Sequence, residues 1–178
     1  MFIQSQIASN LSMITLIAGT ARLGSNTKKI ALEYARLLKE KGVEVNFLSL
    51  DEHNVYERNE EFIKMEKKFL IPTRKFIIIV PEYNGSYSGI LKLMIDNSDV
   101  AHCWHRKKVL LTGVSTGRAG NLRGMEHLTG VLLYLKMHVH HNRLPISVVD
   151  KVLDQNNQIH DSLTLQAIDH QLDEFLSE

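Results

Sequence analysis

The chain has 178 residues, of which 44% are hydrophobic and 23% charged, values that are ordinary for a globular protein. Lysine and arginine number 21 against 20 acidic residues, a net charge of +1 without a dense basic stripe, which disfavours general nucleic-acid binding. No apolar stretch approaches the roughly 20 residues that a membrane-spanning helix needs. We therefore expect a single domain over residues 1–178 that binds neither nucleic acid nor membrane.

The first twelve residues carry scattered apolar side chains without a clear period, and they lack the basic start and long apolar core of a signal peptide. We interpret residues 1–12 as an N-terminal extension, either a loose segment or an arm packed on a partner. The lone cysteine, Cys103, cannot form an internal disulfide, which suits a reducing compartment. Together these features predict a cytoplasmic protein.

A short uncharged run from Ile14 to Ala18 has the pattern of a strand buried on both faces of a parallel sheet. A small polar loop follows it, and apolar positions then recur at helical spacing from Ile30 to Leu38, with Ser25 or Asn26 as the N-cap. The exposed backbone N–H groups of a helix start attract anions. This strand–loop–helix segment is therefore a predicted phosphate-binding site.

The side chains of this loop also favour the binding of an anion. Groups that bind oxyanions, three hydroxyls and one guanidinium, come from Thr20, Arg22, Ser25 and Thr27. The first helical turn holds Lys28 and Lys29, and no acid appears until Glu33. Each cation at a helix start costs up to about 1 kcal/mol, which a bound phosphate would offset. Alternatively both lysines point into solvent at little cost, but the neighbouring hydroxyls favour the phosphate.

The rest of the chain alternates between strand and helix patterns. Further strands are predicted at 43–48, 75–80, 108–112 and within 137–149, and helices at 60–70, 89–100, 122–135 and from Asp161 or Ser162 onward. This alternation indicates an α/β fold with helices on both faces of a parallel sheet, a three-layer sandwich. Right-handed crossovers and five strands favour the order 2-1-3-4-5.

In that order the loops after the first, third and fourth strands meet at the carboxyl edge of the sheet, next to the point where the winding direction reverses. These loops span residues 19–27, 81–86 and 113–120. One supplies oxyanion-binding groups, and the second, which contains proline and glycine, can present backbone groups to a flat ring. The three loops together suit a mononucleotide cofactor.

Two motifs on these loops resemble those of a known family. The stretch GTARLGSNT at residues 19–27 is similar to the G-S-x-R-x-x-S-x-N/T loop of the NAD(P)H-dependent FMN reductases. The stretch PEYNGS at 81–86, with Leu91-Lys92 and Ile95-Asp96, is similar to their P-E-Y-N-G-S-x-P-G-x-L-K-N-x-I-D segment. The likeness covers roughly residues 13–135. It implies a flavodoxin-like fold and a flavoprotein oxidoreductase.

The resemblance implies that FMN takes hydride from NADPH or NADH and passes electrons to a small acceptor, such as free flavin, a quinone or an azo compound. It implies phosphate binding by Thr20, Arg22, Ser25, Asn26 and Thr27. The flavin ring would be lined by Pro81, Glu82, Tyr83, Asn84 and Gly85, with Ser115, Thr116 and Gly117 on a third side. No side chain is expected to be catalytic.

Family members are commonly dimers or tetramers, so the resemblance also implies a homodimer or homotetramer with the flavin near the interface. It would place the apolar helix after Gly89, and Trp104, at that interface. The chain departs from the family pattern at several positions, with Thr20 for serine, Ser88 for proline, Leu93 for asparagine and Asn121 for glycine. None of these changes removes the phosphate-binding groups.

The main alternative is a flavodoxin-type electron carrier, or a flavin-binding sensor, that holds FMN without turning over NAD(P)H. Such carriers are usually strongly acidic and lack an arginine in the phosphate loop. The net charge of +1 and the presence of Arg22 favour the enzyme.

His138, His140 and His141 suggest a possible metal site, because alternate residues of a strand share a face. Histidines at strand ends are more often solvated, and no carboxylate or thiol cluster lies near them in the sequence, so we expect no metal. The basic cluster at residues 105–108 is interpreted as a solvated turn, or alternatively as a contact for the phosphates of the nicotinamide nucleotide.

Overall fold

The structure is a computed structural model that describes residues 14–178, so the expected N-terminal extension over 1–12 lies outside the described residues. The strands are β1 (Ile14–Ala18), β2 (Asn46–Ser49), β3 (Lys75–Pro81), β4 (Lys108–Val114), β5 (His138–Val139) and β6 (Leu144–Ile146). The helices are α2 (Asn26–Glu40), α3 (Glu60–Met65), α4 (Gly89–Asn97), α5 (Val100–Cys103), α6 (Leu122–Tyr134) and α7 (Ser162–Ser177). A π-helical turn, η1 (Glu66–Leu70), continues α3, and a 3₁₀ turn, η2 (Val149–Lys151), precedes α7.

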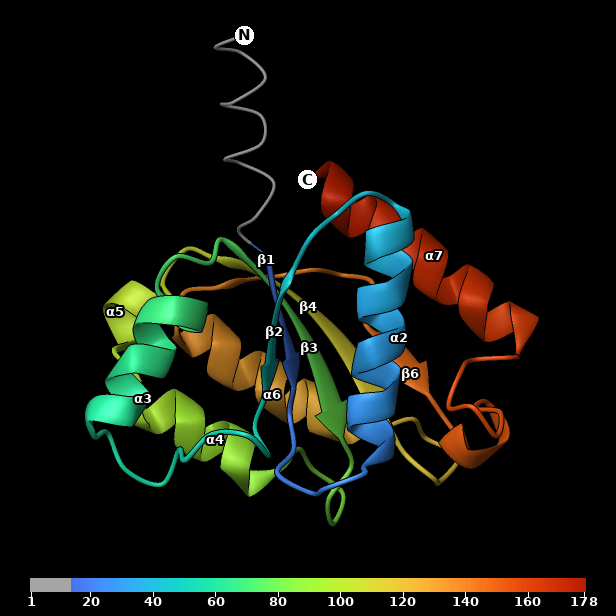
Figure 1. Ribbon diagram of the computed structural model, residues 1–178, viewed down its shortest axis with the longest axis horizontal. Helices are drawn as coiled ribbons and strands as arrows, with labels where there is room; N and C mark the ends of the chain where they lie inside the picture. The colour runs from blue at the N-terminus through green and yellow to red at the C-terminus, as the bar shows by residue number, and fades with distance from the viewer. Residues whose placement is uncertain (1–13) are drawn as a thin grey trace, which may run out of the picture.

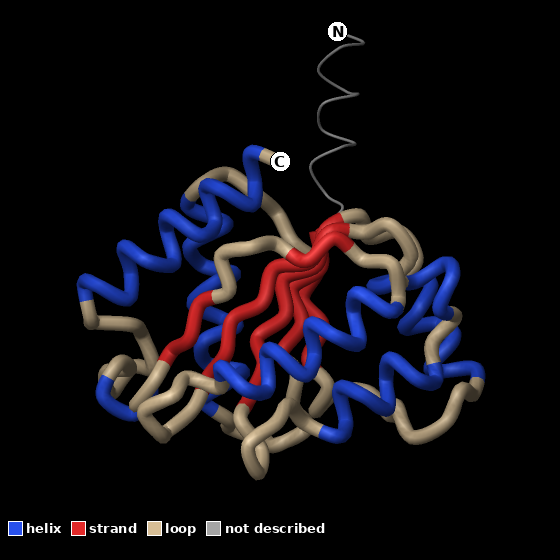
Figure 2. The backbone as a smooth tube through the Cα atoms, turned by 180° about the vertical axis from the view of Figure 1, so that it is seen from behind, coloured by secondary structure: helices blue, strands red, loops and turns tan. Residues whose placement is uncertain are grey.

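The strands form a parallel sheet in the order β2-β1-β3-β4-β5, with β6 also paired to β4 (Figure 2). In the centre of the sheet, Ile78 of β3 lies between Ile17 of β1 and Leu111 of β4. The predicted order 2-1-3-4-5 is confirmed. The predicted fifth strand, however, is divided into β5 and β6.

Two hydrophobic cores, one on each face of the sheet, make the molecule a three-layer sandwich as predicted. Helices α2 and α7 cover one face, and α3 to α6 cover the other (Figure 1). Successive residues of β3 serve different cores, because strand side chains alternate between faces: Ile77 and Ile79 pack with α2 and α7, whereas Ile78 and Val80 pack with α4 and α6. All four side chains are fully buried, which accounts for the uninterrupted apolar run.

The predicted helix over 89–100 is interrupted. Helix α4 ends at Asn97, and Ser98 is extended with its hydroxyl donating to the Ile95 carbonyl at 2.7 Å. Asp99 then caps the short helix α5. Trp104 follows α5, is fully buried in the core of this chain, and donates its indole N–H to Ser98 Oγ at 2.6 Å. The expectation that Trp104 lies at a subunit interface is therefore wrong.

The gap between β5 and β6 is bridged by a side chain from α7. His140 still donates its backbone N–H to the Val109 carbonyl at 2.9 Å, but regular pairing stops at Val139 and resumes at Leu144. The buried amide of Gln171 donates to the carbonyls of Leu111 and Asn142, at 3.2 and 2.8 Å. Helix α7 thus satisfies backbone groups that a continuous strand would have paired.

Smaller differences affect element boundaries. The second strand begins at Asn46 rather than at residue 43, and the predicted helix at 60–70 is an α-helix only to Met65, where the π-helical turn takes over. Ser25, one of the two expected caps, is the N-cap of α2, since its hydroxyl accepts from Lys28 N at 3.2 Å. None of the described helices combines the length and apolar character needed to cross a bilayer.

Candidate functional site

The loops after β1, β3 and β4 meet at one edge of the sheet and line a common cleft, as the strand order predicted. This is the edge toward which the strands of Figure 1 run, opposite the C-terminal end of the chain. The cleft has a volume of about 240 Å³. It is lined by Arg22, Leu23, Ser25, Asn26, Thr27, Pro81, Glu82, Tyr83, Val114, Ser115, Thr116 and Val149.

Most of the predicted site residues lie in this lining, but four do not: Thr20, Asn84, Gly85 and Gly117. Thr20 lies behind the cleft wall and is buried. Asn84 and Gly85 form the tip of a tight turn, at φ angles of 52° and 78°, closed by backbone bonds between Tyr83 and Ser86. These two residues do not line the cleft, whereas Tyr83 does.

Tyr83 joins the first loop to the second. Its hydroxyl shares a hydrogen bond with the hydroxyl of Thr20, and that Thr20 oxygen also accepts from the backbone N–H of Arg22 at 3.2 Å. The guanidinium carbon of Arg22 lies 4.1 Å from the centre of the Tyr83 ring, a cation–π arrangement. Arg22 is thereby held over the cleft although its side chain is exposed.

Ser88, the N-cap of α4, holds the first loop in place. Its buried hydroxyl donates to the Gly19 carbonyl at 2.5 Å and accepts from Leu91 N at 3.4 Å, so it caps α4 as well. Gly19 in turn donates its N–H to Ile79 O at 2.9 Å. A Cβ atom at Gly19 would lie 2.8 Å from that same oxygen, so only glycine allows the loop to approach β3 this closely.

Asn121, at a position where the resemblance led us to expect glycine, supports the second loop. It adopts a left-handed conformation at φ 63°, which asparagine tolerates better than most residues. Its buried amide nitrogen donates to the carbonyls of Val80 and Pro81, at 3.0 and 2.8 Å. Asn121 therefore fixes the end of β3 where the second loop begins.

Lys28, one of the two lysines in the first turn of α2, is paired with acids of the protein itself. Its ammonium group pairs with Asp51 at 2.9 Å and Glu52 at 2.7 Å, both just beyond β2. Burial alone would raise the pKa of Asp51, but hydrogen bonds from Ser49 and Lys28 outweigh it and lower that pKa. The charge of Lys28 at the helix start is thus balanced within the protein, so Lys28 needs no bound dianion to offset it.

Two residues next to the predicted loops were not predicted: Val149, which lines the cleft, and Asp150, which contacts the lining residue Asn26. Both belong to η2, which the structure places beside the third loop through bonds from Val149 N to Ser115 O and from Val148 N to Gly117 O, at 3.1 and 3.0 Å. Asp150 accepts from the side-chain amide of Asn26 at 2.7 Å. A single turn carries no sequence period, so no pattern pointed to these residues.

The donor groups of the cleft fit the phosphate of a mononucleotide. The guanidinium of Arg22 and the hydroxyls of Ser25 and Thr27 surround the start of α2, whose first turn contains no acid. Among the described residues that line the cleft, Glu82 is the only carboxylate. Apolar surface from Pro81, Tyr83 and other lining residues lies beside these donors, which suits a ligand with a charged end and a flat ring.

The basic cluster at residues 105–108 lies at the opposite edge of the sheet, where β4 begins. Lys107 Nζ donates to the carbonyls of Leu70 and Ile71, at 2.8 and 3.0 Å, and Lys108 Nζ donates to Glu178 O at 2.7 Å. These lysines bind the ends of neighbouring elements. The alternative that they contact the phosphates of a nucleotide in the cleft is therefore wrong.

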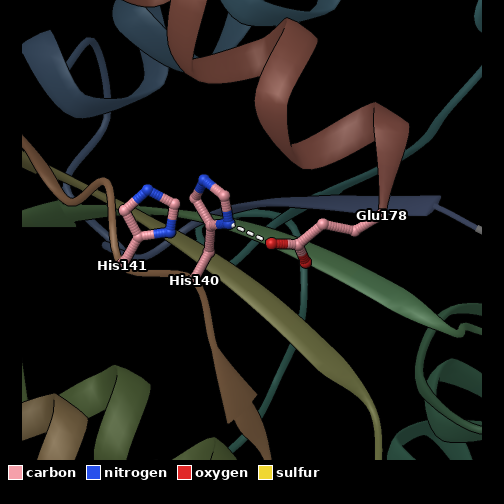
Figure 3. A group of neighbouring side chains, drawn as sticks. All are labelled: His140, His141 and Glu178. Atoms are coloured by element: carbon pink, nitrogen blue, oxygen red, sulfur yellow. Dashed lines mark hydrogen bonds and ion pairs between the residues drawn. The ribbon is translucent and has the colours of Figure 1, made fainter.

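The histidines near β5 do not all face solvent. His138 and His141 are exposed, but the side chain of His140 is only 1% exposed. Helix α7 also brings Glu174 and Glu178 next to them, with His140 Nδ1 2.8 Å from Glu178 Oε1 (Figure 3). We argued from the sequence that these histidines are solvated and have no carboxylates nearby. Neither argument holds for His140, which is buried and lies next to two carboxylates.

Comparison with known proteins places the chain among flavin-dependent oxidoreductases. Residues 12–148 match the NADPH-dependent FMN reductase family. An NAD(P)H-dependent FMN reductase of Pseudomonas aeruginosa is 29% identical over 99 residues, which are 54% of this chain and only about half (54%) of that protein. A 2-hydroxy-1,4-benzoquinone reductase of a Burkholderia species is 24% identical over 82% of this chain and 87% of its own length.

A solved structure has the same fold. FerB of Paracoccus denitrificans, a flavoenzyme NAD(P)H:(acceptor) oxidoreductase, superposes with a TM-score of 0.74 over 93% of this chain and 95% of its own. The two sequences are 18% identical, so this likeness concerns the fold alone. It agrees with the flavodoxin-like architecture that the sequence predicted.

Proposed function

Because the chain belongs to the NADPH-dependent FMN reductase family, we propose that it is an enzyme in which FMN passes hydride from NAD(P)H to a small acceptor. The observation that carries this proposal is the convergence of three loops on one cleft with phosphate-binding groups beside apolar surface. A quinone is the acceptor that we favour, because a relative matched over most of its length is named for a benzoquinone.

In this proposal Arg22, Ser25, Asn26 and Thr27 bind the phosphate of FMN. Thr20 acts indirectly, since its hydroxyl holds Tyr83 and, through the backbone, Arg22. Asn26 is kept in place by Asp150. The charged hydrogen bonds of Arg22 would each contribute about 1.5–3 kcal/mol, more than those of the hydroxyls.

The flavin ring would lie against Pro81, Glu82 and Tyr83, with Ser115 and Thr116 on the other side. Asn84, Gly85 and Gly117 do not line the cleft, and in this proposal their backbone groups approach the polar edge of the ring when FMN is bound. When bound, FMN would supply the redox chemistry. The side chains bind and orient it, and none is proposed to transfer a proton.

The cleft of one chain is smaller than the ~300–1,000 Å³ of typical ligand pockets, which supports a second subunit at its open side. We propose a homodimer or homotetramer. An apolar groove of about 520 Å³ between α4 and α6, which includes Val100 and Tyr134, is the surface that we assign to the contact. We also propose a cytoplasmic location, since the single cysteine, Cys103, is a buried free thiol.

The test combines an FMN titration with steady-state oxidation of NADPH and of NADH, with and without a benzoquinone. Tight FMN binding with quinone-dependent turnover is the expected result. FMN binding without turnover would instead indicate a flavodoxin-type carrier or a sensor. No FMN binding would reject both interpretations.

Arg22→Ala tests the assigned phosphate site. Loss of a charged hydrogen bond should weaken FMN binding by about 1.5–3 kcal/mol, roughly 10- to 150-fold. Arg106→Ala, an exposed arginine at the opposite edge, is the matched control and should leave the FMN dissociation constant unchanged. Equal affinities of wild type and Arg22→Ala would show that the phosphate lies elsewhere.

A further inference from the structure

His140 has a ring nitrogen whose lone pair is buried and unused. Its Nδ1 atom lies 2.8 Å from Glu178 Oε1, whereas its Nε2 atom is buried without a hydrogen-bond partner among the described residues. A carboxylate beside Nδ1 keeps the proton on that nitrogen in the neutral ring, so Nε2 carries the lone pair. A buried acceptor of this kind without a partner destabilises the fold.

Further ligand groups surround this nitrogen. Glu174 Oε2 lies 3.8 Å from His140 Nε2, and Glu174 Oε1 lies 4.0 Å from His141 Nε2. The rings of His140 and His141 are 4.5 Å apart between centroids and stand side by side, facing α7, in Figure 3. One potential ligand atom each from His140, His141 and Glu178 lie within 4.8 Å of one another.

We propose that His140, His141 and Glu174 bind a divalent transition-metal ion, with zinc as the best match, and that Glu178 orients His140 from behind. Imidazole nitrogens and a carboxylate oxygen are typical zinc ligands. A carboxylate that accepts from the far nitrogen of a ligating histidine is the usual second layer of such sites.

Binding requires the side chains of His141 and Glu174 to move toward His140. Bonds of about 2.0–2.2 Å in a tetrahedral site place ligand atoms roughly 3.3–3.5 Å apart. The present separations of 3.8 Å to Glu174 Oε2 and 4.0 Å to Glu174 Oε1 have to close by about half an ångström, and the carboxylate has to turn one oxygen toward both rings. His141 is 77% exposed and Glu174 33%, so both side chains can move while the buried His140 stays fixed.

The neighbours of Glu174 and Glu178 indicate which carboxylate binds the ion and which orients His140. Lys108 Nζ lies 3.6 Å from Glu178 Oε2, so the charge of Glu178 is already shared with a cation. Glu174 is held by Asn142, whose amide donates to Oε2 at 2.7 Å, and its other described partners are histidines. His170 Nδ1 lies 3.4 Å from Glu174 Oε2 and can supply a fourth ligand.

Such an ion would link the end of α7 to the segment between β5 and β6, where the fifth strand is interrupted. This is the sheet edge opposite the flavin cleft, because His140 pairs with Val109 near the start of β4. The ion would therefore stabilise the fold without taking part in turnover. Its binding can be measured on protein without flavin, so the outcome does not depend on the proposed function.

The experiment titrates Zn²⁺ into tag-free, metal-stripped full-length protein in competition with a chelating dye, and repeats the thermal unfolding with one equivalent of Zn²⁺. The expected result is one saturable site and a higher melting temperature. Co²⁺ in place of Zn²⁺ should give the visible absorption of a four-coordinate site. Absence of saturable Zn²⁺ binding by the wild type would overturn the proposal.

Variants locate the site. His141→Ala and Glu174→Gln change exposed or partly exposed side chains, so they should fold, and each should weaken Zn²⁺ binding by about tenfold or more. His138→Ala removes an exposed histidine three residues before His141 and should bind as the wild type does. Undiminished binding by His141→Ala, or an equal loss in His138→Ala, would show that these residues do not form the site.

Discussion

At the scale of single residues, Ser88 shows how a departure from the family pattern acquires a structural role. The motif that the sequence resembles led us to expect proline at this position, whereas the serine hydroxyl here both caps α4 and donates to the Gly19 carbonyl of the first loop. One side chain thus connects the start of a helix with the loop that we assign to the cofactor.

We expect Ser88→Ala to lower the free energy of unfolding by about 1–2 kcal/mol, because it removes a helix cap and leaves a buried carbonyl unpaired. Urea denaturation measures this change. Ser86→Ala is the control: its hydroxyl forms an exposed bond with His127, so a loss below about 0.5 kcal/mol is expected. A similar small loss for Ser88→Ala would mean that its two bonds contribute little.

Lys107 gives a prediction for pH. Burial lowers the pKa of its ammonium group from 10.5 to about 8. Between these two values the unfolded chain binds more protons than the folded one, so this group makes the free energy of unfolding rise with pH. Below pH 8 the folded protein carries the full cost of the buried charge.

Lys107→Met removes this group. The stability difference between wild type and variant should therefore shift in favour of the wild type as the pH rises from about 8 to about 10.5. Denaturation curves at several pH values measure it, with the exposed Lys39→Met as the control. A difference that stays constant over this range would contradict the assigned shift.

At the scale of elements, the end of β4 shows how closely the third loop folds back on the sheet. A Cβ atom on Gly113 would lie 2.2 Å from the carbonyl oxygen of Gly120, a contact that no rotamer can relieve. The strand therefore needs glycine near its end, because backbone from its own loop occupies the space where a side chain would stand.

Gly113→Ala should accordingly destabilise the protein by about 1–3 kcal/mol or more, since backbone has to move to admit the methyl group. Gly89→Ala is the matched control, because Gly89 is the first residue of α4 and, apart from its chain neighbours and the helix backbone, no atom lies within 4 Å of the added methyl group. This variant should be neutral or stabilise the protein by up to about 1 kcal/mol. The measurement compares the melting temperatures of the two variants with that of the wild type. Equal changes in melting temperature would show that the loop after β4 can move to admit the methyl group at little cost.

At the scale of the whole molecule, exposed apolar side chains mark the surface that we assign to a second subunit. Tyr134 at the end of α6 is 86% exposed and Val100 of α5 is 38% exposed, and both line the groove between α4 and α6. Isolated exposed apolar residues are ordinary, but a group along one groove is typical of an interface.

Tyr134→Glu should shift the protein toward monomers in sedimentation experiments, because a charge cannot be buried there without a partner. Tyr56→Glu changes a tyrosine that is 72% exposed outside the groove, and should leave the oligomeric state unchanged. If the wild type sediments as a monomer at micromolar concentration, or both variants behave alike, this groove is not the contact.

The sequence by itself determined the order of the sheet and the loops that meet at its edge. The strand order and the position of the loops follow from local information. Buried strands appear as apolar runs and helices as apolar positions with a period of 3.6 residues. The right-handedness of crossover connections then leaves few possible strand orders. Arg22, Ser25 and Tyr83 could be assigned to the cleft for the same reason, since each lies in a loop that directly follows a strand.

Tertiary structure alone decided which distant groups meet. Lys28 is neutralised by acids after β2, Asp150 of η2 binds Asn26 of the cleft, and His140 is buried against a carboxylate at the end of the chain. The sequence separates these partners by 23 to 124 residues, and charged or polar side chains on surface turns carry no period that would reveal a partner. Packing of α7 over the interrupted fifth strand creates the histidine–glutamate cluster, so only the folded chain could show it.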